Sequence, residues 1–152
     1  MDRQTIIDRF NDNRQPAMDT LNGTVTAFEP ETGACTMEFR ATTGMCHSVE
    51  GHSRGGIVQG GFVAGFLDSA MACACIGRSR FTVAVPSLEL KVSFLAPVHP
   101  GVVRVEARIR RWGRSICFLE AELFDAEGGL LATASSTAKV VALRTEMAAA
   151  AG

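Results

Sequence analysis

The chain has almost no excess of charge of either sign. Its 152 residues include 15 lysines and arginines against 16 aspartates and glutamates, so the formal net charge is −1. Domains that bind nucleic acid generally carry a clear positive excess, because the phosphate backbone supplies most of their affinity. We therefore expect no nucleic-acid partner. Any anionic ligand must be bound by a local basic patch.

Paired cysteines and a leader segment are also missing. The five cysteines are odd in number and scattered, whereas a disulfide framework needs an even number at regular spacings. Reduced thiols are typical of a reducing compartment. No apolar stretch of the kind found in secretory signals follows the first residues, Met1-Asp2-Arg3-Gln4. The sequence favours a cytoplasmic location.

Histidine is scarce, and its placement does not indicate a metal site. His47, His52 and His99 lack the close, repeated ligand pairs of known structural metal sites. We therefore expect no metal and no cofactor.

The chain also has no uninterrupted membrane-spanning run. Its longest apolar stretch, residues 57–76, contains Gln59, Asp68, Ser69 and three glycines, so it makes a poor transmembrane helix. We expect no membrane partner. The stretch instead reads as a helix from about Gln59 to Gly77 that is apolar on nearly every face, and such a helix is buried in a protein core.

The other predicted elements describe one domain with a short extension at each end. Residues 1–20 form an N-terminal helix or arm, in which Pro16 ends the helical pattern. Residues 145–152 form a frayed tail. Between them, residues 21–144 begin with two strands, 21–28 and 34–40, joined by a turn. An unusually long loop, residues 41–56, follows them, and loops of this length are often functional.

Four strand-like stretches follow the buried helix. They are separated by short, turn-like connections, which predict an antiparallel meander. One face of this sheet must be covered, and the apolar helix is the element able to cover it. We therefore predict an α+β protein in which a curved antiparallel β-sheet wraps around one long central helix. The four stretches are residues 81–95, 102–112, 115–125 and 130–143.

Asp68 is the one formal charge in the buried helix. A carboxylate placed in an apolar core costs roughly several kcal/mol unless it is paired or put to use. Two interpretations stay open from the residues alone. Asp68 is either a satisfied core acid, hydrogen-bonded to Ser69 or to backbone, or a reactive carboxylate.

Several short motifs follow one another in the order of the predicted elements. They are Gly56-Ile57-Val58-Gln59-Gly60-Gly61, Leu67-Asp68-Ser69-Ala70, the stretch 85–97 that begins Val85-Pro86-Ser87, and Gly101, Gly113-Arg114, Asp125, Gly128 and Thr137. Together with the order of elements, these motifs resemble the hotdog-fold acyl-CoA thioesterases of the phenylacetic-acid-degradation type, within the 4-hydroxybenzoyl-CoA thioesterase superfamily. The similarity extends from about Gly23 to Val141.

This resemblance implies an enzyme that hydrolyses the thioester of a small or medium acyl- or aryl-CoA to free acid and CoA. It implies that Asp68 acts as base or nucleophile, and that Gly60 N–H stabilises the oxyanion. Gln59 and Ser87 would position the reactants. The physical chemistry agrees, because a helix N-terminus offers unpaired N–H groups and glycines admit a ligand to the backbone.

The resemblance further implies a site shared across a dimer interface, in a homodimer or a dimer of dimers. Asp68 of one subunit would then face Gly60 of the other. The sequence departs from the family at Gln59, where relatives commonly have His, and at Ser53, where many have Asn. A glutamine can orient a carbonyl or a water molecule, but it cannot titrate near neutral pH.

Ser53, Gly61, Arg111 and Arg114 are the candidate substrate-binding residues. The arginines belong to a basic cluster on one hairpin, which is either a solvated strand face or a cradle for the phosphates of the CoA substrate. Trp112 in the same hairpin either covers the adenine ring or packs on its own sheet.

Two other functions compete with the thioesterase. A non-catalytic acyl-CoA binding or sensing module fits the glutamine at position 59. A hotdog hydratase ranks last, because it requires a paired Asp and His, and no histidine lies on this helix.

Overall fold

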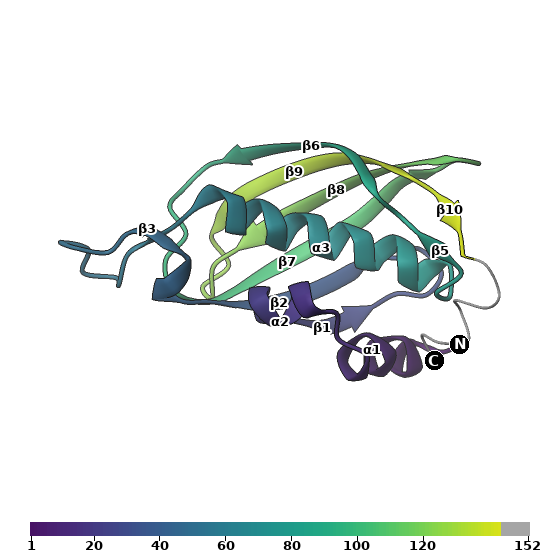
Figure 1. Ribbon diagram of the computed structural model, residues 1–152, viewed down its shortest axis with the longest axis horizontal. Helices are drawn as coiled ribbons and strands as arrows, with labels where there is room; N and C mark the ends of the chain where they lie inside the picture. The colour runs from purple at the N-terminus through teal and green to yellow at the C-terminus, as the bar shows by residue number, and fades with distance from the viewer. Residues whose placement is uncertain (144–152) are drawn as a thin grey trace.

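An antiparallel sheet of six strands and one long helix dominate residues 1–143, the part of the chain that the computed structural model describes. Helix α3 (Gly60–Arg78) lies along the inner face of the sheet, which curves around it (Figure 1). This confirms the predicted α+β class and the hotdog fold. In spatial order the strands are β1 (Gly23–Phe28), β2 (Cys35–Ala41), β7 (Gly101–Trp112), β8 (Ile116–Phe124), β9 (Leu130–Lys139) and β6 (Ser87–Phe94).

Helix α3 is the core element that its composition predicts. Within residues 1–143 it is the one helix long and apolar enough to cross a membrane, yet half of it is buried inside the protein. Its buried side chains pack against the inner face of the sheet. Gly33, in the turn between β1 and β2, touches the C-terminal half of α3 with a φ of +78°, and a Cβ there would lie 2.9 Å from the carbonyl oxygen of Ala74. Only glycine fits this contact.

The predicted four-stranded meander is wrong at its first strand. Strands β7, β8 and β9 do form a meander, but β6 pairs with β9 at the edge of the sheet, and β7 pairs with β2. The predicted strand over 81–95 is also broken. Pro86 separates β6 from the short β5 (Val83–Ala84) because proline has no N–H for a ladder. Strand β5 pairs with β10 (Val141–Ala142) in a second small sheet.

The N-terminal extension contains two helices rather than one. Helix α1 (Arg3–Asp12) ends before Pro16, and Pro16 begins α2 (Pro16–Leu21) instead of ending the first helical pattern. Proline is favoured at the first position of a helix, where its missing N–H has no partner to lose. Helix α1 packs against β1 and buries Ile6.

Part of the predicted loop over 41–56 is ordered. It contains a short 3₁₀ helix, η1 (Thr43–Met45), and β3 (Cys46–Ser48), which pairs with β4 (Ile57–Val58). The remaining segment projects from the body of the protein at the N-terminal end of α3 (Figure 1). The Ser48 hydroxyl, at the end of β3, and His52 Nε2, within the projecting segment, lie 2.6 Å apart.

Candidate active site

Asp68 has one hydrogen-bond partner among residues 1–143, and that partner comes from the sheet. The Ser87 hydroxyl donates to Asp68 Oδ1 over 2.6 Å. Asp68 is therefore bonded neither to Ser69 nor to backbone, which were the partners expected of a satisfied core acid. Its side chain is half-buried, and Oδ2 accepts no hydrogen bond within the described residues. The carboxylate thus has one fixed oxygen and one available oxygen.

A β-bulge brings Ser87 to the side of the sheet that faces α3. Ser87 pairs with Ala138 and Glu89 pairs with Thr137, so Leu88 is the extra residue on β6. Cross-strand partners point to the same face, and Ala138 is buried beneath α3. Strict alternation would place Ser87 on the outer face with Glu89, so the bulge changes the face that Ser87 occupies.

The bulge is held by a buried hydroxyl. Ser136 on β9 is the buried polar residue in the described core, with 5% of its surface exposed, and its Oγ donates to the carbonyl oxygen of Glu89 over 2.8 Å. Ser136 was not among the predicted residues, because a serine within Ala134-Ser135-Ser136-Thr137-Ala138 carries no signal of this role.

Gln59 caps the N-terminus of α3. Its Oε1 accepts the N–H of Gly61 over 2.6 Å, and its backbone carbonyl accepts the N–H of Phe62 over 3.0 Å. A Cβ on Gly61 would lie 2.7 Å from Gln59 Oε1, so the cap depends on glycine there. The N–H of Gly60 has no acceptor within residues 1–143. The helix therefore presents one free N–H, with the amide NH₂ of Gln59 beside it.

An apolar cavity of about 360 Å³ adjoins this helix end. Phe94, whose side chain is 57% exposed, stands over Gly60, and a Cβ on Gly60 would lie 3.1 Å from the Phe94 ring. An apolar cavity of this kind accepts an apolar group of a ligand. Because Gly60 lines the cavity, its free N–H can donate a hydrogen bond to a polar group of the same ligand. The lining residues are His47, Ile57, Val58, Gly60, Val63, Phe94, Leu95, Ala96, Pro97 and Val98.

Gly60 and Asp68 do not meet within one chain. They are eight residues apart on α3, which corresponds to about 12 Å along the helix axis. One small carbonyl group cannot contact both. The predicted catalytic residues therefore form two half-sites in a single chain: Asp68 with Ser87, and Gly60 with Gln59.

The candidate substrate-binding residues are spread over both ends of α3. Ser53 is exposed in the loop that projects at the N-terminal end of α3. Arg111 and Arg114 are exposed at the opposite end, because β7 runs from Gly101 near the start of α3 to Trp112 near its end. Neither arginine has an ion pair among residues 1–143.

The remaining arginines of the basic cluster lie on a solvated strand face. Arg104 pairs with Glu106, and Arg108 and Arg110 pair with Glu120, at 3.0 to 3.5 Å. Trp112 packs against the core, and the Arg78 guanidinium lies 5.5 Å from the centre of its ring. These contacts favour the structural interpretation for this part of the hairpin.

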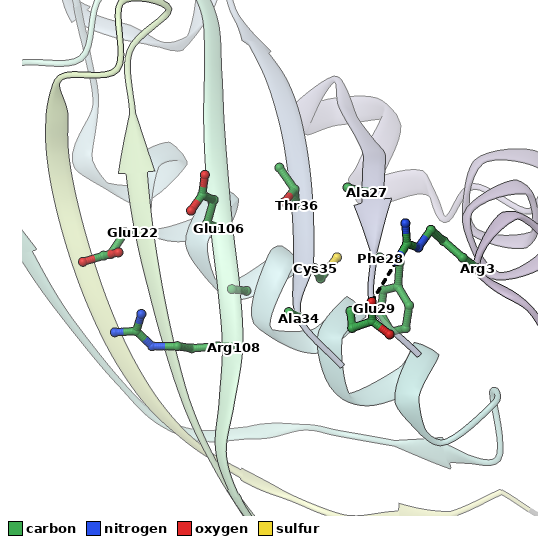
Figure 2. A pocket seen from close by; sticks show the side chains of 11 residues that line it. Arg3, Ala27, Phe28, Glu29, Ala34, Cys35, Thr36, Glu106, Arg108 and Glu122 are labelled. Carbon is green, nitrogen blue, oxygen red and sulfur yellow. Dashed lines mark hydrogen bonds and ion pairs between the residues drawn. The ribbon is translucent and has the colours of Figure 1, made fainter. Parts of the chain in front are cut away.

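A second cavity, of about 410 Å³, lies on the outer face of the sheet beside α1. Figure 2 shows Glu106, Arg108 and Glu122 projecting around it, with Arg3 bonded to Glu29 over 2.8 Å at one side. None of its lining residues comes from α3 or β6. This cavity is therefore separate from Asp68. Within residues 1–143, no group of three or more potential metal ligands gathers anywhere.

Comparison with known proteins places these features in a family. Residues 55–132 match the model of the thioesterase superfamily. A Saccharolobus solfataricus protein named as a proposed esterase is 30% identical over 95 residues, which cover 62% of this chain and 67% of that protein. The phenylacetic acid degradation-related protein of Ralstonia eutropha JMP134 superposes with a TM-score of 0.75 at 33% identity, over 84% of this chain and 92% of that one.

A more distant relative has the same fold. The PaaI protein from the phenylacetic acid degradation operon of E. coli superposes with a TM-score of 0.73 at 17% identity, over 90% of this chain and 96% of that chain. The matched residues 55–132 contain the helix end, Asp68 and Ser87. Both half-sites therefore lie in the part of the chain that the superfamily shares.

Proposed function

The chain belongs to the thioesterase superfamily, and from that premise we propose that it hydrolyses the thioester of a small or medium acyl- or aryl-coenzyme A to free acid and CoA. The observation that carries this proposal is the carboxylate of Asp68, fixed by Ser87 over 2.6 Å and open at its second oxygen. A positioned, partly solvated carboxylate is suited to accept a proton or to attack a carbonyl.

The proposed reaction uses the two half-sites on opposite sides of the thioester. With Asp68 as base, the carboxylate takes a proton from water as the water oxygen attacks the carbonyl carbon. The negative charge that develops on the carbonyl oxygen is stabilised by the free N–H of Gly60. Collapse of the intermediate breaks the carbon–sulfur bond, and the CoA thiolate leaves with the proton held by Asp68.

With Asp68 as nucleophile, its carboxylate attacks the carbonyl carbon and forms an anhydride as CoA leaves. Water then opens the anhydride. A single turnover in ¹⁸O-labelled water, with enzyme in excess, identifies the anhydride route if label appears in Asp68. If water attacks the aspartyl carbonyl, the label enters Asp68, whereas the base mechanism labels only the released acid.

A second subunit supplies the missing half-site in this proposal. Gly60 and Asp68 are about 12 Å apart along one helix axis, so Gly60 of one subunit acts with Asp68 of its partner. Three features support a homodimer, or a dimer of dimers, formed at this face. Among residues 1–143, strand β6 pairs on one side only, Leu88 and Leu95 are more than half exposed, and α3 presents the half-exposed Asp68 toward that edge.

The remaining predicted residues hold the substrate in this proposal. Ser53 and Gly61 lie at the helix end that receives the thioester, and the NH₂ group of Gln59 orients the carbonyl or the attacking water. Arg111 and Arg114 bind phosphates of the CoA moiety, since neither is paired within residues 1–143. Their replacement by glutamine is expected to raise KM with little change in kcat. The reduced cysteines fit a cytoplasmic setting.

A panel of straight-chain and aromatic acyl-CoA esters, assayed by trapping the released thiol, tests the proposal. We expect hydrolysis of at least one ester, and a fall of about 10²- to 10⁴-fold in kcat for Asp68→Asn, because the substitution removes the base or nucleophile. Ser69→Ala, at the next position on α3, is the matched control and is expected to keep normal turnover. Unchanged turnover in Asp68→Asn would exclude this mechanism. Binding of the esters without thiol release would identify a non-catalytic acyl-CoA binding module.

A further inference from the structure

Two side-chain hydrogen bonds join α3 to the main sheet within residues 1–143. One is the bond between Ser87 and Asp68, and the other joins the sulfur atoms of Cys75 and Cys117, which lie 3.2 Å apart. Asp68 and Cys75 are seven residues apart, which is two turns of helix, so both bonds lie on one side of α3. The proposed hydrolysis uses the first bond and makes no use of the second.

The two sulfur atoms are close to bonding distance and are shielded from solvent. Cys75 and Cys117 are both 0% exposed. A disulfide bond is about 2.05 Å long, so an approach of about 1 Å between the sulfurs would form it. Both residues lie near the end of their elements, with Cys75 three residues before the end of α3 and Cys117 second in β8. Closing the gap requires a shift of about 1 Å between the end of α3 and β8.

The surroundings lower the pKa of the Cys117 thiol, although burial opposes this shift. The S–H of Cys75 donates to Cys117, which lowers the pKa of the Cys117 thiol, and the Arg78 guanidinium lowers it further. The same hydrogen bond, together with burial, raises the pKa of Cys75. Trp112 is the cross-strand neighbour of Cys117 and lies under the Arg78 guanidinium at 5.5 Å. The thiol pair, the cation and the indole form one cluster at the C-terminal end of α3.

A second pair of cysteines offers an internal comparison. Cys73 on α3 and Cys35 on β2 are also buried, but no hydrogen bond joins them within the described residues. Burial raises the pKa of Cys73 to about 12 and that of Cys35 well above its ordinary value. Of these two helix-to-sheet pairs, only Cys75 and Cys117 combine a sulfur–sulfur hydrogen bond with a lowered pKa on one of the two thiols.

We propose that Cys75 and Cys117 form a reversible disulfide that fastens the end of α3 to β8 when a local opening of the helix end admits a small hydroperoxide to the buried sulfurs. The Cys117 thiolate attacks the peroxide oxygen and becomes a sulfenic acid, and the peroxide is reduced to an alcohol, or to water when it is hydrogen peroxide. Cys75 then attacks the sulfenic sulfur, which releases water and leaves the disulfide. In a reducing compartment such a bond is transient, because cellular thiols reverse it.

The test exposes the full-length chain to hydrogen peroxide and counts thiols after unfolding in denaturant. We expect two of the five thiols to be lost, with return of both after dithiothreitol. Peptide mapping is expected to show the Cys75 peptide joined to the Cys117 peptide. Trp112 is the one tryptophan of the chain, so its emission reports the event directly, since a neighbouring disulfide quenches indole fluorescence. The oxidised protein is expected to unfold at a higher temperature, because the bond closes a loop across 42 residues.

Alanine variants of the two pairs separate this site from general oxidation. Cys35→Ala and Cys73→Ala are expected to lose two thiols as the natural chain does, whereas Cys75→Ala and Cys117→Ala are expected to form no intramolecular disulfide. Retention of all five thiols after peroxide, a link between Cys35 and Cys73, or oxygen added to single cysteines without a link would each overturn the proposal. If an alanine variant of the pair does not fold, the peptide map of the natural chain decides the question alone.

Discussion

The two edge strands of the main sheet, β1 and β6, differ in whether other residues cover their outer side. At the β1 edge, α1 packs alongside the strand, and the Asn11 side chain exchanges two hydrogen bonds with the backbone of Val25, at 2.9 and 3.0 Å. At the β6 edge, no element of residues 1–143 pairs with the outer side of the strand. Leu88, Phe94 and Leu95 are 57 to 59% exposed there.

An open strand edge with exposed apolar side chains favours association with another chain. At β1, the Asn11 amide bonds the backbone of Val25 as a partner strand would, so this edge does not favour association with another chain. The β6 edge has no such protection, and it is the edge that carries Ser87 and lies beside Asp68. The difference supports the proposal that the open β6 edge is the assembly surface, which would lie next to the proposed chemistry.

Among substitutions at the two sheet edges, the largest loss of turnover is expected from a charge placed on the β6 edge. Leu88→Arg puts a guanidinium where the proposed partner strand lies, and an unpaired charge buried in an interface costs roughly several kcal/mol. We expect the dimer to dissociate and hydrolysis to fall at least about 100-fold, since each subunit then has only half a site. Sedimentation velocity measures the mass, and thiol release measures the activity.

Two controls accompany this variant. Thr26→Arg places the same charge on the sealed β1 edge and is expected to change neither mass nor activity. Leu88→Val keeps an apolar residue at the bulge and is expected to remain dimeric. A Leu88→Arg protein with the natural mass and turnover would show that the β6 edge is not the interface.

A smaller loss of turnover is expected when a substitution at the β6 edge removes only the Ser87 hydroxyl. Ser87→Ala removes the 2.6 Å hydrogen bond to Asp68, and hydrogen bonds to charged groups contribute about 1.5 to 3 kcal/mol. We expect kcat to fall about 10- to 100-fold, with the protein still dimeric. Ser87 is exposed in the single chain and water can replace its hydrogen bond there, so the loss acts on catalysis and the free energy of unfolding should change by less than about 0.5 kcal/mol.

Ser87→Thr keeps the hydroxyl and serves as the rescue variant. It is expected to recover most of the lost turnover. Equal turnover in Ser87→Ala and the natural protein would mean that Asp68 needs no help from β6 in catalysis.

Periodicity predicted the central helix well, because a run apolar on nearly every face fits only the core. The expected helix from about Gln59 to Gly77 and the observed α3 differ by one residue at each end. Alternation also located most strands, but it does not encode which strands are neighbours. The position of β6 beside β9 therefore could not be derived, and neither could the role of Pro16, which suits both a helix end and a helix start.

In the candidate site, too, the sequence does not encode which residues become neighbours. The resemblance pointed to both Asp68 and Ser87, and the structure joins them. The feature that joins them is the bulge at Leu88, with Ser136 bonded to Glu89. A bulge is a property of two paired strands, so the β6 sequence alone carries no record of it. The separation of Gly60 from Asp68 follows from helix geometry once the helix is known.

The smallest effect is expected at the sealed edge. Asn11→Ala removes both hydrogen bonds to Val25, and we expect the free energy of unfolding to fall by about 1 to 2 kcal/mol in denaturant titration. Turnover should be unchanged, because Asn11 lies across the sheet from β6. Asn11→Asp retains the acceptor for the Val25 N–H and loses only the donor, so an intermediate loss is expected. If Asn11→Ala instead reduced turnover as strongly as Ser87→Ala, the two edges would be coupled, and the separation between a structural edge and a functional edge would fail.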